Sequence, residues 1–109
     1  MLYNLSLKLP YQLIPAMNYE DIPLIYNEEA ASFEFFIEGH RCFIDCKKKG
    51  NTIYLIHTEV PESLEGKGVA AALVEKTFQY LEENHLKMVP SCSYVLLYLK
   101  RHPEWNKLL

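Results

Sequence analysis

What this 109-residue chain lacks narrows its class before any motif is considered. It has no apolar run near the roughly 20 residues that a helix needs to cross a bilayer, so we expect no membrane-embedded segment. It has only three cysteines, an odd and low number that argues against the disulfide framework of a small secreted protein. Its N-terminus lacks a cationic lead-in followed by an apolar core, which argues against a signal peptide. We therefore expect a cytoplasmic protein.

Positive charge is also scarce. The formal net charge is −3 at pH 7, which argues against a nucleic-acid partner. The nearest basic patch is the run of three lysines at 47–49, and such a run before Gly50 and Asn51 is typical of a solvated hairpin turn. Half of the residues are apolar and 23% are charged, which is typical of a single globular domain and not of a disordered chain.

Residues 1–31 differ in residue pattern from the rest of the chain, and we interpret them as an N-terminal extension of a domain at 32–109. Prolines at 10, 15 and 23 separate short apolar pieces, so the extension has room only for a short strand, at 5–9. From residue 32 onward a period of two predicts a meander of three antiparallel strands. Phe33, Phe35 and Ile37 alternate with other residues, a return strand follows at 41–46, and a third strand is predicted at 52–60.

The period then changes from two to 3.6, which indicates a helix. Asn84 is a reasonable end for this helix, residues 87–90 are short enough for a fourth strand, and a last helix is expected at 93–102, before Pro103. The order β-β-β-α-β-α predicts an α+β fold. The apolar positions of the first helix are Ala70, Leu73, Val74, Thr77, Phe78 and Leu81.

Between the third strand and the first helix lies a glycine loop, Glu65-Gly66-Lys67-Gly68. Glycines permit a phosphate to approach the backbone, and the unpaired N–H groups of a helix start attract an anion. A plain strand-to-helix turn is the alternative, since the loop is neither a Walker motif nor a dinucleotide fingerprint.

Two side chains of reactive types lie at the predicted helices and strands. Cys92 precedes the last helix, where the helix dipole and free N–H groups favour a thiolate, although a buried, inert cysteine is the alternative. His57 lies on the third strand, and alternation places it on the face of Leu55 and Glu59. It is either a general base or a structural histidine whose ring forms its hydrogen bonds within the sheet. Cys42 and Cys46 are expected in the core and not as metal ligands.

The glycine loop resembles the coenzyme A pyrophosphate loop of the GCN5-related N-acetyltransferases, with the pattern on Glu65-x-x-Gly68-x-Ala70. Several ordered segments together look like the minimal subgroup of that superfamily, which consists of short predicted acetyltransferases. The resemblance covers about residues 32–109. The segments that carry it are His57-Thr58-Glu59-Val60-Pro61, Gly66-Lys67-Gly68-Val69-Ala70, Val89-Pro90-Ser91-Cys92-Ser93-Tyr94-Val95 and Lys100-Arg101-His102-Pro103-Glu104-Trp105.

The resemblance implies binding of acetyl-coenzyme A as co-substrate. The strand end at Glu59 and Val60 would meet the pantetheine arm. Glu65 stands where the family usually has arginine or glutamine, and its carboxylate would repel a pyrophosphate. Its backbone N–H and the charge of Lys67 are the features that would compensate. The loop residues whose amides would hold the pyrophosphate are Gly66, Lys67, Gly68, Val69 and Ala70.

The resemblance also assigns roles to side chains. A cysteine at the position of Cys92 is the proposed active-site residue of the subgroup. Tyr98 falls where a tyrosine of the superfamily often protonates the departing thiolate, and Tyr94, one turn earlier, competes for that role. Either tyrosine would otherwise belong to the core.

We therefore expect an N-acetyltransferase that passes an acetyl group from acetyl-coenzyme A to an unidentified amine. The alternative is a non-catalytic module that binds coenzyme A or a protein partner through the same fold. Residues 94–99 are apolar nearly all round, which indicates a helix that is half core and half interface. The sequence names neither the acceptor nor the oligomeric state.

Overall fold

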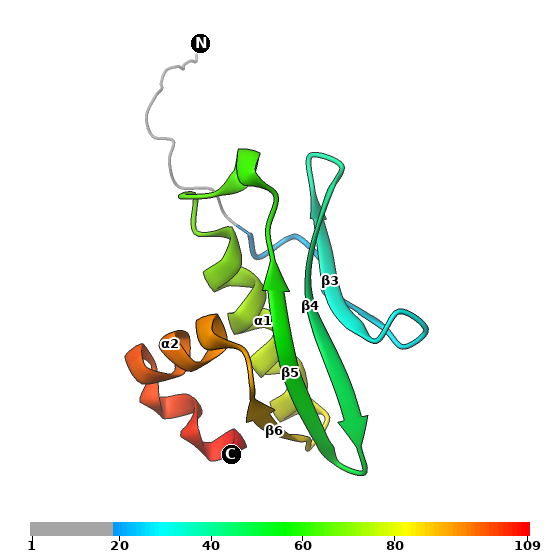
Figure 1. Cartoon of the computed structure of the whole chain (residues 1–109), viewed down its shortest axis with the longest axis vertical. Helices are drawn as coiled ribbons and strands as arrows, with labels where there is room; N and C mark the ends of the chain where they lie inside the picture. Colours follow the sequence, from blue (N-terminus) through cyan, green and yellow to red (C-terminus); the bar gives the residue numbers. More distant parts are fainter. Residues whose placement is uncertain (1–18) are drawn as a thin grey trace.

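A five-stranded sheet forms the centre of the protein, as seen in a computed structural model that describes residues 19–109 (Figure 1). The strand order is β2-β3-β4-β5-β6. Strands β2 to β5 pair antiparallel with one another, and β6 runs parallel to β5. The strands are β2 (Ile25–Asn27), β3 (Ser32–Ile37), β4 (His40–Lys49), β5 (Thr52–Glu59) and β6 (Lys87–Pro90).

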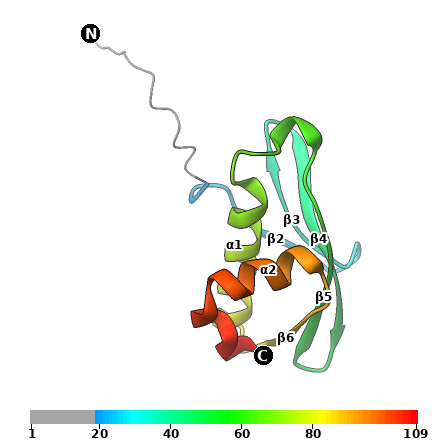
Figure 2. The same ribbon diagram turned by 60° about the vertical axis from the view of Figure 1, so that its left-hand side comes forward.

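Within residues 19–109 the helices all follow β5, and α1 and α2 lie on the same side of the sheet (Figure 2). The parallel pairing of β5 and β6 requires a crossover connection, which α1 supplies. The order of strands and helices confirms the predicted α+β class. The helical elements are the 3-10 helix η1 (Glu62–Leu64), α1 (Val69–Glu83), α2 (Ser93–Arg101) and the 3-10 helix η2 (Pro103–Leu108).

The core lies between the helices and the face of the sheet that they cover. Phe33 of β3 contacts Tyr80 of α1 edge to face, and Phe78 of α1 contacts both Tyr98 of α2 and Trp105 of η2. The predicted apolar positions of the first strand and the first helix are buried, except that Ala70 is only half-buried. The core placement expected for Cys42 and Cys46 is confirmed, and burial, helped by the adjacent Asp45, raises the pKa of the Cys46 thiol to about 11.

Several elements differ from the prediction. The lysines at 47–49 belong to β4, which continues to Lys49, and only Gly50 and Asn51 make the turn. The last α-helix ends at Arg101, close to the predicted end at 102, and a 3-10 helix that the sequence did not predict, η2, follows from Pro103. A further strand, β2, lies within the predicted extension and pairs with β3, while Tyr19 packs against the core. The short strand predicted at 5–9 lies outside the described residues.

The largest departure from regular geometry is a β-bulge in β5. Asp45 pairs with His57, but the next residue, Cys46, pairs with Leu55, so Ile56 is an additional residue on β5. A bulge of this kind changes which face the following side chains occupy. Leu55 is fully buried on the helix side, whereas His57 pairs with Asp45 on the opposite face. The predicted placement of His57 on the same face as Leu55 is therefore wrong, because alternation counted through Ile56 ignores the bulge.

Candidate functional site

The candidate site begins where β5 and β6 separate. Their pairing ends at Leu55 and Pro90, and Ser91 makes one more bond by donating its N–H to the carbonyl of Leu55 at 2.9 Å. Beyond this point β5 continues to Glu59, while the other chain segment turns away into α2. The last residues of β5 thus have no strand on that edge among the described residues, and their backbone groups there are open to another partner.

The glycine loop faces this open edge and leads into α1. Gly66 and Gly68 have φ angles of 79° and 76°, which favour glycine and explain both residues. Gly68 is the N-cap of α1 and provides no side chain to cap the helix. Within residues 19–109, no protein acceptor is found for the backbone N–H groups of residues 66–71. A row of free N–H groups at a helix start is suited to an anion such as a phosphate.

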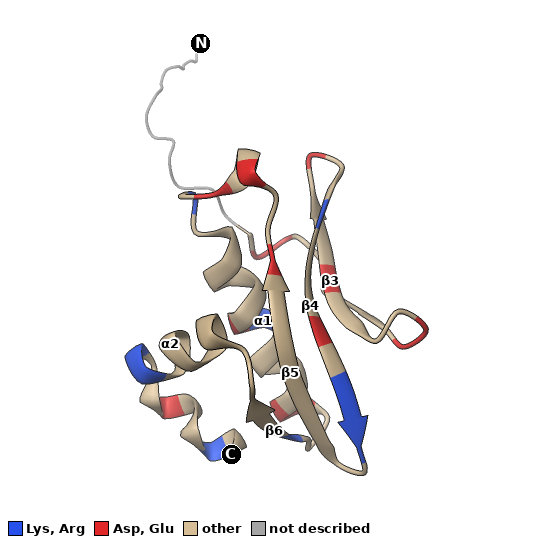
Figure 3. Cartoon of the chain, viewed as in Figure 1, with Lys and Arg blue, Asp and Glu red and all other residues tan. Residues whose placement is uncertain are grey.

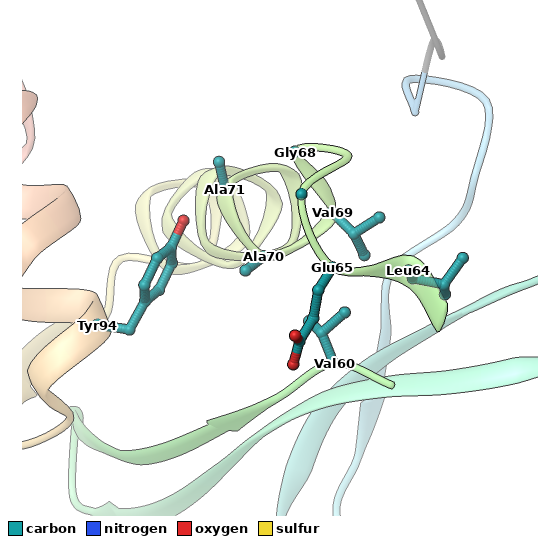
Figure 4. A pocket seen from close by; sticks show the side chains of 9 residues that line it. Val60, Leu64, Glu65, Gly68, Val69, Ala70, Ala71 and Tyr94 are labelled. Carbon is teal, nitrogen blue, oxygen red and sulfur yellow. The ribbon is translucent and has the colours of Figure 1, made fainter. Parts of the chain in front are cut away.

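A groove joins the loop, the end of β5 and the start of α2 (Figure 4). Its two adjoining pockets have volumes of about 270 and 250 Å³ and share Val60, Glu65, Ala70 and Tyr94. Tyr94 forms the wall opposite α1, and the Glu65 side chain extends toward Val60 (Figure 4). The polar residues that line the groove are Thr58, Glu59, Glu65 and Tyr94, together with the loop glycines, and the other lining residues are apolar.

Two further details define the loop. The backbone N–H of Glu65 donates to the carbonyl of Glu62 at 3.1 Å, so it is occupied and does not offer the compensation suggested by the sequence. Lys67 is exposed, and its carbonyl accepts a hydrogen bond of 2.6 Å from the hydroxyl of Tyr19. That contact ties the loop to the chain 48 residues earlier, in a region that was predicted to be an extension.

The reactive side chains lie on two faces of β5. His57 Nε2 lies 2.8 Å from Glu59 Oε1, and both side chains are about half exposed on the face away from the helices. Thr58 lies between them on the helix side, where its Oγ1 is 3.3 Å from the Sγ of Cys92. Cys92 is buried at the N-cap of α2. The structure therefore brings His57 together with Glu59, and Cys92 together with Thr58, but places His57 and Cys92 on opposite faces.

Tyr98 lies outside the groove, in the core between α1 and η2. Its hydroxyl donates to Glu75, and its ring stacks on His102. Burial raises the pKa of Tyr98, and the hydrogen bond to the Glu75 carboxylate raises it further. The same carboxylate accepts a bond of 3.1 Å from Trp105 Nε1. Of the two tyrosines considered for proton donation, Tyr94 is the one that lines the groove.

The family profile described as GCN5-related N-acetyl-transferase matches residues 32–108. The chain belongs to this family. The matched residues include both the point where β5 and β6 separate and the glycine loop.

Several relatives and one solved structure are similar to this chain. The chain is 36% identical over 52 residues to Protein NATD1 of Xenopus tropicalis, covering 48% of each chain. It is 37% identical over 49 residues to Protein NATD1 of Homo sapiens, covering 45% of this chain and 43% of the relative. The match therefore spans just under half the length of these curated relatives. A GCN5-like protein of Staphylococcus aureus, determined by NMR, shares the fold with a TM-score of 0.61 and 24% identity, covering 82% of this chain and 88% of that one.

Some partners in the site were not expected from the sequence. Thr58 and Glu75 contact predicted site residues across 34 and 23 positions, and no local pattern reveals contacts of that range. Residues 19–109 contain no group of three or more side chains suited to a metal ion. Over the same part of the chain, none of the helices is both long enough and apolar enough to cross a membrane.

Proposed function

We propose that this family member transfers an acetyl group from acetyl-coenzyme A to the nitrogen of an amine. The observation that supports this most strongly is the row of unpaired N–H groups at residues 66–71, beside the open edge of β5. A phosphate-binding helix start and an unpaired strand edge suit the two polar parts of coenzyme A, its pyrophosphate and its amide-containing pantetheine arm.

In this proposal the amides from Gly66 to Ala70 hold the pyrophosphate, with Lys67 as the nearest positive charge. The pantetheine arm pairs with the backbone near Glu59 and Val60. The apolar walls of the groove, at Val60 and Ala70, then cover the alkyl part of the arm. The thioester reaches the point where β5 and β6 separate, and a backbone N–H there can polarise its carbonyl.

Acetyl transfer needs a neutral amine, a polarised carbonyl and a proton for the leaving thiolate. The amine nitrogen attacks the carbonyl carbon, an N–C bond forms, and the C–S bond breaks. His57 takes the proton from the amine, and the carboxylate of Glu59, 2.8 Å away, orients the ring and stabilises its charged form. A proton returns to the thiolate of coenzyme A from the helix side of β5. Tyr94 is the better-placed donor, since it lines the groove while Tyr98 donates to Glu75.

Cys92 has two possible roles in the proposal. As an acid, it protonates the thiolate of coenzyme A. As a nucleophile, it accepts the acetyl group in a thioester exchange, and the amine then attacks the acetyl-cysteine. Its thiol is buried and contacts Thr58, so a carrier role requires the Sγ atom to become accessible to the thioester.

An acetylation assay across a panel of primary amines tests the proposal. Turnover with at least one amine, lost in His57→Ala, supports transfer. Binding of coenzyme A without turnover across the panel favours the non-catalytic module instead. Mass spectrometry after treatment with acetyl-coenzyme A separates the roles of Cys92. An acetyl adduct that is absent from Cys92→Ala supports the carrier, whereas full activity of Cys92→Ala eliminates both roles. Cys46→Ala, which also removes a buried thiol, is the matched control.

A further inference from the structure

The chain segment before β2 contacts the glycine loop. The hydroxyl of Tyr19 donates to the carbonyl of Lys67 over 2.6 Å, and Tyr19 packs against the core. The carbonyl of Glu20 accepts from Nζ of Lys76 in α1 at 3.2 Å, which gives the segment a second attachment. The segment passes the loop on the side away from Tyr94 (Figure 4). The Tyr19 hydroxyl is thus held against the outside of the loop, opposite the groove.

The hydrogen bond from Tyr19 sets the direction of one N–H group in the loop. In a trans peptide, the carbonyl and the N–H of the next residue point in opposite directions. Gly66 and Gly68 line the groove, whereas Lys67 does not. Because the carbonyl of Lys67 points to Tyr19, the N–H of Gly68 points away from Tyr19 and toward the groove. Burial raises the pKa of Tyr19, so its hydroxyl keeps its proton at neutral pH and remains a donor.

The peptide between Lys67 and Gly68 can turn over unless an outside group holds it. The N–H of Glu65 donates to the carbonyl of Glu62, which fixes the loop on the η1 side. The carbonyl of Gly68 accepts from Ala72, which fixes it on the α1 side. Between these points Gly68 has access to either sign of φ, and among the described residues no atom beyond its chain neighbours lies within 4 Å of a Cβ placed there. A reversed peptide would direct the carbonyl oxygen of Lys67 into the groove, where it would repel a phosphate.

The direction of this N–H matters because the side-chain charge around the loop is mainly negative. Residues 59–68 contain three glutamates and one lysine, and Figure 3 shows the acidic residues at the end of β5 and at η1. That lysine, Lys67, is exposed. An anion at the loop is therefore attracted chiefly by backbone N–H groups, which bind anions only when they converge on them.

We propose that Tyr19 is a positioning residue, whose hydroxyl turns the N–H of Gly68 toward the pyrophosphate of coenzyme A. This inference rests on the function proposed above for the glycine loop. Tyr19 lies before residues 32–108, which the family profile matches. The segment that the sequence predicted to be an extension is then part of the cofactor site.

Tyr19→Phe tests the proposal in the full chain, because it keeps the ring and removes only the hydroxyl. The loss of one such hydrogen bond should weaken coenzyme A binding about fivefold, measured by isothermal titration calorimetry. Pantetheine, which lacks the pyrophosphate, should bind equally to the variant and the wild type in an NMR titration. Tyr54→Phe is the matched control, since Tyr54 pairs with Lys47 at the far end of β5, and it should change the affinity by less than about twofold. Unchanged coenzyme A binding by Tyr19→Phe, or equal weakening of coenzyme A and pantetheine, overturns the proposal.

Two measurements keep the proposal distinct from the proposed function. In the free protein, Tyr19→Phe should shift the carbonyl ¹³C signal of Lys67 and the amide ¹⁵N signal of Gly68, and the absence of both shifts overturns the proposal. A wild-type chain that does not bind coenzyme A would contradict the proposed function, and inorganic pyrophosphate then tests the loop by itself. Weaker binding of pyrophosphate by Tyr19→Phe than by the wild type supports the positioning role in that case. Equal binding by the two proteins, or binding by neither, overturns it.

Discussion

Glu65 is the residue at which the proposed coenzyme A site is most open to a quantitative test. Its carboxylate lies in a groove of about 270 Å³, which corresponds to a sphere about 8 Å across. A pyrophosphate with two negative charges at that distance is repelled by about 1 kcal/mol in a solvent-like dielectric. Glu65→Gln removes this repulsion with little change in shape. We therefore expect coenzyme A to bind about fivefold more tightly to Glu65→Gln, measured by isothermal titration calorimetry at low salt.

High salt and a matched variant separate the electrostatic repulsion by Glu65 from other effects of the substitution on affinity. At 1 M salt the screening length falls to about 3 Å, so the advantage of Glu65→Gln should largely disappear. Glu62→Gln changes the same charge three residues earlier in η1, outside the groove lining, and should alter the affinity by less than twofold. Equal effects of the two variants, or weaker binding by Glu65→Gln at low salt, would refute the placement of the pyrophosphate beside Glu65.

Three further predictions concern stability and proton transfer. Gly68→Ala should lower the free energy of unfolding by about 1–2 kcal/mol, measured by urea titration, since φ is 76° while no atom obstructs a Cβ. Arg41→Met should cost about 1–3 kcal/mol at pH 7 by removing the 2.6 Å partner of buried Glu34. Burial alone would raise the pKa of Glu34, but hydrogen bonds, chiefly from Arg41, outweigh it and lower the pKa. The contribution is therefore complete above about pH 4.5 and is lost as the pH falls further, so the two urea curves should converge in acid. Tyr94→Phe should reduce kcat of acetyl transfer at least tenfold, whereas Tyr98→Phe should reduce stability by about 1–2 kcal/mol with a smaller effect on kcat.

Much of the fold could be predicted from the sequence because its local signals agree. Alternation at Phe33, Phe35 and Ile37 has a period of two, and the apolar positions from Leu73 to Leu81 have a period of 3.6. Both segments are buried as those periods require. The positive φ angles of Gly66 and Gly68 are conformations that glycine adopts readily, so residue type alone indicates the glycine loop.

The contacts that arrange the site are harder to predict from the sequence, because they depend on tertiary packing and not on local residue patterns. The bulge at Ile56 has no residue signature, since an isoleucine suits a regular strand equally well, yet it moves His57 to the other face. The choice between Tyr94 and Tyr98 depends on Glu75, which lies 23 residues before Tyr98 on another helix. Strand β2 is short, and its pairing with β3 comes from tertiary packing that residue propensity does not reveal.

Binding of coenzyme A at the glycine loop is tested most directly by an NMR titration of the ¹⁵N-labelled full chain with coenzyme A. We expect saturable binding, with the largest shifts of amide signals at residues 66–71 and at the end of β5 near Glu59. Signals from the lysines at 47–49, at the far end of the sheet, should move little. No shifts at millimolar coenzyme A, or shifts that avoid the glycine loop, would contradict it.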